Sequence, residues 1–335
     1  TEEMGKPIKE SRSEIEKCAW AMEYFADNGR TFLTGEVLNT DARRSFVTFE
    51  PFGVVGSIMP WNFPFWQALR FASPSLMAGN TIILKPASST MQCGIEIEDT
   101  FQKAGIPTGI FQTLIGDSSA AEVLIDSDIN AVTFTGSVSV GAKVAQRATS
   151  QLKKIVLELG GSDPFIVCDD ADIEKAAIGA VKGRFINCGQ SCIASKRFIV
   201  VKKIAEKFID KFVQNTEKLK VGDPLLDDTD IGPLINSSSM LNMESMVEDS
   251  IKQGANVLTG GQRLDSKGFF YKPTIMDNVT SKMRVATEEV FGPIAPIITV
   301  DDEQEAMKIA NDSVYGLGAS IWTQNLDKAE RLSGN

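Results

Sequence analysis

The sequence contains no histidine. Any nucleophile must therefore react without an imidazole base, which favours a thiol over a hydroxyl, because a thiol is already partly ionised at neutral pH. A zinc site is not expected either, since only Cys188 and Cys192 lie close together in the chain and a tetrahedral site needs more ligands. The five cysteines are odd in number and scattered, which is typical of reduced thiols in a cytoplasmic protein.

Long apolar segments and an excess of basic residues are also lacking. No apolar run approaches the length of a membrane span and no signal peptide is recognisable, so a membrane partner is not expected. The formal charge of −10 argues against nucleic acid and anionic membranes as partners. With 335 residues and 43% hydrophobic content, the chain is long enough for two globular domains, each with its own core.

Strand-like and helix-like patterns alternate along most of the chain, beginning with a helical pattern over residues 7–29. This alternation predicts an α/β fold with a parallel sheet and helices on both of its faces. Such sheets bind nucleotides at the carboxyl ends of their strands, although the G-x-G-x-x-G fingerprint is absent here. The rhythm changes at Gly160, which predicts a domain boundary. The expected strands include residues 52–59, 81–86, 131–135, 153–159, 163–168, 197–201, 269–276 and 294–300.

Three residues could take part in acyl chemistry. Cys192 follows a Gly-Gln pair in a loop at the end of a helical pattern, where reactive groups are often presented, yet a free cysteine is also an ordinary buried residue. Asn62 lies in the stiff turn PWNFP, where its amide could stabilise an oxyanion or simply complete the turn. Glu158 ends an apolar strand, where it could act as a general base or face water.

Further motifs could hold a nucleotide. Lys85 stands at the carboxyl end of an apolar strand, where it could bind a ribose or a phosphate, or extend to the surface. Gly136 and Ser137 open a helix after a strand, as either a pyrophosphate site or a plain helix cap would. Glu289 could hold ribose hydroxyls and Phe291 could pack against a nicotinamide ring, although a charged turn with a core phenylalanine has the same pattern.

Taken together, six motifs resemble the aldehyde dehydrogenase superfamily in order, spacing and residue identity over essentially the whole chain. They are residues 60–64 (PWNFP), 84–86 (LKP), 134–137 (FTGS), 157–161 (LELGG), 189–192 (GQSC) and 288–293 (EEVFGP). The resemblance implies a Rossmann-like cofactor domain over residues 1–32 and 52–160, an oligomerisation hairpin over residues 33–51 and a catalytic domain over residues 161–335. It also implies a homodimer or homotetramer, and a family length greater than this chain at both ends.

The resemblance assigns a role to each motif. Cys192 would be the nucleophile, Asn62 and the backbone N–H of Cys192 would form the oxyanion hole, and Glu158 would activate the water that releases the acid. The cofactor residues would be Ile58, Trp61, Lys85 and Ser88 around the adenosine half, Gly136 and Ser137 near the pyrophosphate, Glu289 on the nicotinamide ribose and Phe291 beside the ring. Attack of the thiolate on an aldehyde, loss of hydride and hydrolysis of the thioester would complete the reaction.

Two departures from the family pattern bear on specificity. NAD-preferring members often have a glutamate where this chain has Ser88, so NADP is expected to be accepted alongside NAD, or preferred. Arg70 and residues 161–167 and 196–198 resemble one bacterial branch of succinate-semialdehyde dehydrogenases. Arg70 lies two helical turns after Asn62, from where its guanidinium could bind the distal carboxylate of a semialdehyde. A second arginine of other such enzymes is replaced here by Ile186.

Alternatives to this hypothesis remain open at the level of sequence. The substrate could be another small aldehyde. The chain could instead be a CoA-acylating semialdehyde dehydrogenase, although those relatives lack the glutamate that matches Glu158. It could be a non-catalytic member kept as a structural or binding protein, against which Cys192, Asn62 and Glu158 all argue. A redox pair between Cys188 and Cys192 is a further possibility.

Overall fold

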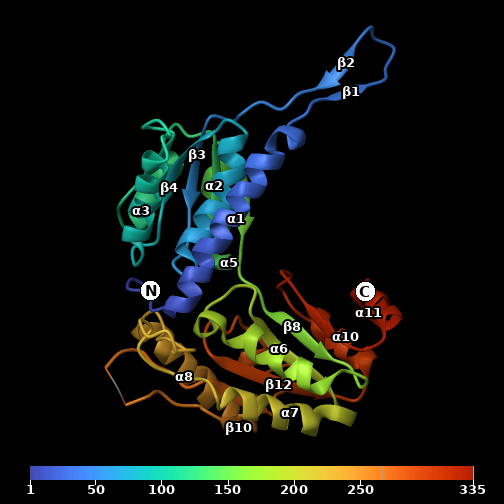
Figure 1. Ribbon diagram of the computed structural model, residues 1–335. Coiled ribbons are helices and arrows are strands. Elements are labelled where there is room, and N and C mark those ends of the chain that lie inside the picture. Colours follow the sequence, from blue (N-terminus) through green and yellow to red (C-terminus); the bar gives the residue numbers. More distant parts are fainter. Residues whose placement is uncertain (266, 335) are drawn as a thin grey trace. The chain divides into compact units, whose positions relative to one another are not determined.

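The computed structural model describes residues 1–265 and 267–334 (Figure 1). The chain divides into two compact units. The first unit comprises Ser11–Leu159, and the second unit comprises Thr1–Glu10 together with Gly160–Asn335. Among the described residues, no helix is both long enough and apolar enough to cross a membrane.

The first unit is built on a five-stranded sheet in the order β5-β4-β3-β6-β7 with every pair parallel. Its strands are β3 (Val54–Ile58), β4 (Thr81–Lys85), β5 (Phe111–Thr113), β6 (Ala131–Thr135) and β7 (Lys154–Glu158). All five residues of β6 are buried, as expected for a central strand covered on both faces. The chain reverses its direction of strand addition between β3 and β6, where open parallel sheets bind ligands.

Helices cover both faces of this sheet, which confirms the predicted architecture. They are α1 (Ile8–Phe32), α2 (Pro64–Met77), α3 (Met91–Lys103), α4 (Ser118–Asp126) and α5 (Val138–Thr149). One hydrophobic cluster packs α4 and α5 against Val132 and Phe134, and another packs α2 and α3 against Ile82 and Leu84. A two-stranded antiparallel hairpin of β1 (Glu36–Leu38) and β2 (Ser45–Val47) forms a separate sheet.

The second unit is built on a six-stranded sheet in the order β10-β11-β12-β9-β8-β13, in which only β10 runs antiparallel to its neighbour. Its strands are β8 (Asp163–Val167), β9 (Ser195–Val201), β10 (Asn256–Thr259), β11 (Thr274–Asp277), β12 (Ile294–Val300) and β13 (Ser320–Trp322). Its helices are α6 (Ile173–Phe185), the 3-10 helix η1 (Ile186–Gly189), α7 (Lys202–Thr216), α8 (Ser237–Lys252), α9 (Arg284–Thr287), α10 (Glu303–Asn311) and α11 (Leu326–Ser333).

One predicted strand is shorter than the pattern indicated. The apolar pattern over residues 269–276 predicts a continuous strand, but β11 begins only at Thr274. Pro273 lies inside the predicted range, and a proline has no N–H to contribute to a ladder. Tyr271 forms only an isolated bridge with Arg263.

The first ten residues belong to the second unit, whereas the family resemblance grouped residues 1–32 with the cofactor domain. The backbone N–H of Ile8 donates to Pro224 O at 2.7 Å, and the Glu10 carboxylate accepts from the Asn187 N–H at 2.8 Å. Lys9 Nζ lies 2.5 Å from Asp230 Oδ1. The helical spacing of apolar residues continues unbroken through Glu10, so this spacing alone does not reveal that the chain passes from the second unit to the first at this point.

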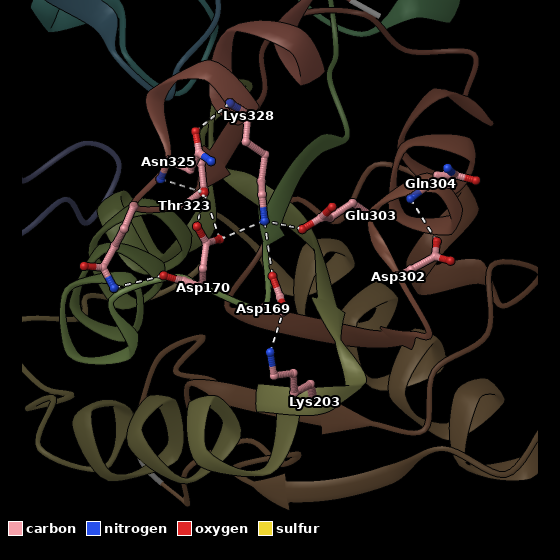
Figure 2. Close-up of polar contacts among 10 residues, drawn as sticks. Asp169, Asp170, Lys203, Asp302, Glu303, Gln304, Thr323, Asn325 and Lys328 are labelled. Carbon is pink, nitrogen blue, oxygen red and sulfur yellow. Dashed lines mark hydrogen bonds and ion pairs between the residues drawn. The ribbon is translucent and has the colours of Figure 1, made fainter.

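A charge network holds α11 in the second unit (Figure 2). The Lys328 ammonium lies 3.2 Å from Asp169 Oδ1, 3.1 Å from Asp170 Oδ1 and 2.5 Å from Glu303 Oε1. Thr323 donates to Asp170 at 2.8 Å. Three carboxylates from two other segments therefore share one cation, which is only 16% exposed.

Candidate active site

The loop that carries Cys192 has an unusual backbone. Asn187, Cys188 and Gly189 have φ values of 52°, 57° and 72°, so three consecutive residues lie in the left-handed region. For a residue with a side chain this conformation costs about 1 kcal/mol or more. Asn187 and Cys188 are buried, so tertiary contacts hold the chain in this shape. The turn directs the chain out of α6 and into the loop of Cys192, which is itself partly buried.

Two side chains fix this turn. The Glu10 carboxylate accepts from Asn187 N, as described above, and burial raises the pKa of Glu10 to about 7 against the opposing effects of that hydrogen bond and of two nearby lysines. Gln190 is 1% exposed; its Oε1 accepts from Ile235 N at 2.9 Å and its Nε2 donates to Asn187 O at 3.2 Å. The Gly-Gln pair of the motif is therefore structural support for the loop.

Arg184 ties the same loop to the segment that carries Glu289. Its guanidinium is fully buried and donates to Ser195 O at 2.9 Å, Gly189 O at 3.2 Å and Val290 O at 3.0 Å, and also to Gly292 O. Burial lowers the pKa of Arg184 to about 9. Since all these acceptors are backbone carbonyls, the guanidinium fixes main chain on both sides of the loop.

Glu289 lies beside this loop, in the second unit. Its Oε1 accepts from Gly161 N at 3.2 Å and lies 3.4 Å from Lys196 Nζ. A side chain at Gly160 would displace the Glu289 carboxylate, because an added Cβ would come within 2.3 Å of Glu289 Oε2. The Gly-Gly pair after β7 therefore allows the chain to pass close to this carboxylate, whose ribose-binding role stays a prediction, as does the role of Phe291.

The candidate base and the candidate substrate anchor lie together in the first unit. Glu158 is the last residue of β7, and its Oε1 lies 3.8 Å from Arg70 Nη1. Arg70 is on α2, and its Nη2 donates to Gln67 Oε1 at 3.1 Å. Both charged side chains are partly exposed, at 37% for Arg70 and 40% for Glu158, so both remain accessible to a ligand.

Asn62 precedes α2 and is 3% exposed. Pro64 is the first residue of that helix, a position where its fixed φ and missing N–H carry no cost. The next two N–H groups, of Phe65 and Trp66, donate to Glu14 Oε1 at 3.0 and 2.9 Å. This buried carboxylate of α1 therefore fixes the start of the helix that follows Asn62, a role the sequence analysis missed.

The carboxyl ends of four strands meet at one edge of the first unit's sheet. Lys85 pairs with Ile58, which pairs with Phe134, and Thr135 pairs with Glu158. The order along the edge is therefore Lys85, Ile58, Phe134 and then Glu158. The structure brings these predicted residues together because the parallel register places their strand ends side by side.

A groove of about 740 Å³ opens at this edge. Ile58, Lys85, Gly136 and Ser137 line it, as the cofactor hypothesis requires, whereas Trp61 and Ser88 are not among its lining residues. Burial lowers the pKa of Lys85, and the Asp117 carboxylate partly opposes this shift. A buried cation in a groove of this size suits an anionic nucleotide.

The start of α5 fits a pyrophosphate. Ser137 caps the helix, with its Oγ accepting from Val140 N at 3.4 Å, and the N-terminal N–H groups face the edge where the groove lies. Gly136 is needed for close packing, because an added Cβ would lie 2.5 Å from Phe134 Cζ. Groove, cation and helix start together fit a dinucleotide cofactor.

The cysteines bear on the redox hypothesis. Cys188 is 1% exposed, and burial raises its pKa well above the ordinary range of a thiol. A thiol that is held protonated is a poor partner for thiol–disulfide exchange. None of the five cysteines, Cys192 included, forms a disulfide in the described part of the chain. This geometry favours a structural role for Cys188.

One cluster has the ligand types of a metal site. Single ligand atoms of Cys168, Asp170 and Glu303 lie within 4.8 Å of one another in the described part of the chain. The Lys328 ammonium is bound to both carboxylates (Figure 2), and burial raises the pKa of Cys168 to about 11. An internal cation already binds the carboxylates of the cluster, and we assign no metal to it.

Comparison with known proteins places this geometry in a family. Residues 1–335 match the model of the aldehyde dehydrogenase family. A probable NADP(+) succinate-semialdehyde dehydrogenase of Synechocystis sp. is 48% identical over 333 residues, which are 99% of this chain and 73% of that protein. The NADP(+) succinate-semialdehyde dehydrogenase of Mycobacterium avium is 45% identical over 336 residues, which are 99% of this chain and 71% of that protein. The solved succinic semialdehyde dehydrogenase of Streptococcus pyogenes in complex with NADP+ has a TM-score of 0.96 at 33% identity, with 99% of this chain and 73% of that chain covered.

Proposed function

Because the chain belongs to the aldehyde dehydrogenase family, we propose that it oxidises succinate semialdehyde to succinate with NADP+ as the acceptor. The family predicted from the six motifs is thereby confirmed, and with it the activity class, NAD(P)-dependent aldehyde oxidation. The observation that carries the choice of substrate is the position of Arg70, whose partly exposed guanidinium lies beside Glu158. Relatives that are 44 to 48% identical are named for the same substrate.

The Arg70 guanidinium can bind the carboxylate of an anionic aldehyde. The guanidinium lies 3.8 Å from Glu158 Oε1 and makes a long ion pair. An ion pair between partly exposed groups of this kind contributes less than about 1 kcal/mol of stability. The carboxylate of a semialdehyde could therefore take the guanidinium as a bidentate partner at little cost. Binding would then also release Glu158 from its ion pair and leave it available to water.

The reaction assigns a step to each residue. The Cys192 thiolate adds to the aldehyde carbon, and the oxyanion is held by the Asn62 amide and the backbone N–H of Cys192. Loss of one such donor typically costs about 3–4 kcal/mol of barrier. Collapse of the oxyanion to a thioester on Cys192 expels a hydride, which a nicotinamide cofactor, when bound, would accept. Glu158 then takes a proton from the water that attacks the thioester, which releases the acid and regenerates the thiolate.

NADP+ is proposed as the preferred cofactor because of the charges at the groove. Lys85 lines it, and Ser88, which is exposed, stands where a glutamate would repel a 2′-phosphate. Lys143 and Arg147 also line the groove, but Arg147 is engaged by Asp126 at 2.5 Å. Lys85 and Lys143 are therefore the cations we assign to the phosphates.

The hairpin of β1 and β2 supports a homodimer or homotetramer. Its apolar side chains are exposed, among them Val37 at 75%, Phe46 at 55% and Phe49 at 57%. Exposed apolar side chains gathered on one hairpin indicate a protein–protein contact. We propose a second copy of the chain as the partner, and sedimentation of the purified protein measures it.

Kinetics with a charged and a neutral aldehyde test the proposal. In Arg70→Gln we expect KM for succinate semialdehyde to rise about tenfold to a hundredfold, the value of a lost charged hydrogen bond, while KM for propanal stays unchanged. Arg263→Gln, which removes an exposed arginine paired with Glu244, is the matched control and should change neither value. Equal effects of Arg70→Gln on both aldehydes would contradict the anchor. Product analysis with and without coenzyme A separates hydrolysis from acyl transfer to CoA.

A further inference from the structure

A lysine is completely buried next to the nucleophile. Lys196 is on β9, four residues after Cys192, and its side chain is 0% exposed. Its Nζ donates to Cys192 O at 2.6 Å. Lysines are almost never fully buried without a partner, because removing the ammonium from water costs several kcal/mol. We therefore expect a charged partner that compensates for the burial of the Lys196 ammonium.

The partner is Glu289, at 3.4 Å from Lys196 Nζ. The same carboxylate oxygen accepts from Gly161 N at 3.2 Å. One ammonium thus contacts both the main chain of the candidate nucleophile and the carboxylate that the family pattern places on the nicotinamide ribose. All of these groups belong to the second unit.

The charges around Lys196 are mixed. Burial, followed by the nearby Arg184 guanidinium, lowers the pKa of Lys196 to about 8, while Glu289, Asp163 and Cys192 act in the opposite direction. Lys196 therefore stays mostly protonated at neutral pH. Because the Cys192 thiolate favours the protonated lysine, the protonated lysine favours the thiolate to the same extent.

We propose that Lys196 is a positioning residue for both halves of the reaction: its ammonium fixes the loop of Cys192, favours the thiolate and holds Glu289 ready for the cofactor ribose. The proposal rests on the proposed function for the role of Glu289. In a chain without histidine, this buried cation supplies the positive charge next to the main chain of Cys192 that an imidazolium could otherwise provide. Arg184 supports the same loop but donates to backbone carbonyls.

Alkylation of Cys192 in the absence of cofactor and substrate tests the thiol half. Lys196→Met keeps an unbranched side chain that is one atom shorter and removes the charge. We expect iodoacetamide labelling of the Cys192 peptide at pH 7, followed by mass spectrometry, to slow about tenfold, and its pH midpoint to move up by about one unit. Lys203→Met, which removes an exposed lysine paired with Asp169, is the matched control and should leave the midpoint unchanged.

Equilibrium binding of NADP+ tests the cofactor half. We expect Lys196→Met to weaken binding severalfold, because Glu289 loses the group that holds it. If Lys196→Met does not fold, Glu289→Gln decides the thiol half when it is assayed at pH 6, well below the pKa of Lys196, where the ammonium is kept without the carboxylate. Labelling of Cys192 should then be as fast as in the wild type or faster, while NADP+ binding weakens. An unchanged labelling midpoint in folded Lys196→Met, or slowed labelling in Glu289→Gln, would overturn the proposal. Neither readout depends on which aldehyde is the substrate, so failure of the substrate assignment is seen separately.

Discussion

The carboxylate of Glu10 gives a prediction whose sign depends on pH. Burial raises its pKa from an ordinary 4.5 to about 7. Below pH 4.5 the group is protonated in both the folded and the unfolded chain and contributes no pH dependence. Between pH 4.5 and 7 the unfolded chain releases the proton first, so the free energy of unfolding falls as pH rises. Above pH 7 the full penalty remains.

The loss of stability on ionising Glu10 follows from the rise in its pKa. The rise from 4.5 to about 7 corresponds to about 3 kcal/mol of unfolding free energy, and we expect about 2 kcal/mol because the side chain is only partly buried. Glu10→Gln keeps an oxygen to accept from Asn187 N and removes the titration. The variant should therefore be more stable than the wild type by about 2 kcal/mol at pH 8 and equally stable at pH 4.5.

Urea unfolding at the two pH values, monitored by tryptophan fluorescence, measures this difference in stability. Glu206→Gln, an exposed position on α7, is the matched control, and its effect should be small and independent of pH. A Glu10→Gln variant that is less stable than the wild type at pH 8, or whose effect is the same at both pH values, would refute the reasoning. Such a result would mean that the Glu10 carboxylate is ionised and well compensated in the folded protein.

Two further changes test other parts of the molecule. Lys328→Met leaves Asp169, Asp170 and Glu303 without their shared cation, so we expect the free energy of unfolding to fall by about 1–2 kcal/mol in urea titrations, because solvent screens these partly exposed carboxylates. An unchanged midpoint would show that the network is not needed to hold α11. Ser88→Glu introduces the carboxylate that NAD-preferring relatives often have at this position, so kcat/KM with NADP+ should fall at least about tenfold while the value with NAD+ holds or rises. An equal loss with both cofactors would contradict the assignment.

Local patterns in the sequence predict much of the fold. The strand predicted over residues 131–135 is β6, whose five residues are all buried, and Asp172 caps α6 with its carboxylate accepting from Lys175 N at 3.2 Å. The parallel register then places Lys85 and Glu158 at the same edge of one sheet. These features depend on neighbours that are close in sequence or on the general geometry of parallel strands.

The supports of the site could not be predicted in the same way. Lys and Arg are ordinarily surface residues, so nothing local marks Arg184 and Lys196 as buried cations beside the loop of Cys192. The contacts of Glu10 with Asn187 and of Arg184 with Gly292 join positions 177 and 108 residues apart. Glu14 is likewise one more charge in an amphipathic helix until α2 is placed against it. Only tertiary structure reveals these contacts.

The most direct test of the account asks whether Cys192 carries the acyl group. In Glu158→Gln the thioester should form but hydrolyse slowly, so mixing this variant with succinate semialdehyde and NADP+ should give about one NADPH per active chain in a single burst. Mass spectrometry should then find the succinyl group on the Cys192 peptide. Steady turnover with no acyl group on Cys192, or an acyl group on another residue, would contradict the account.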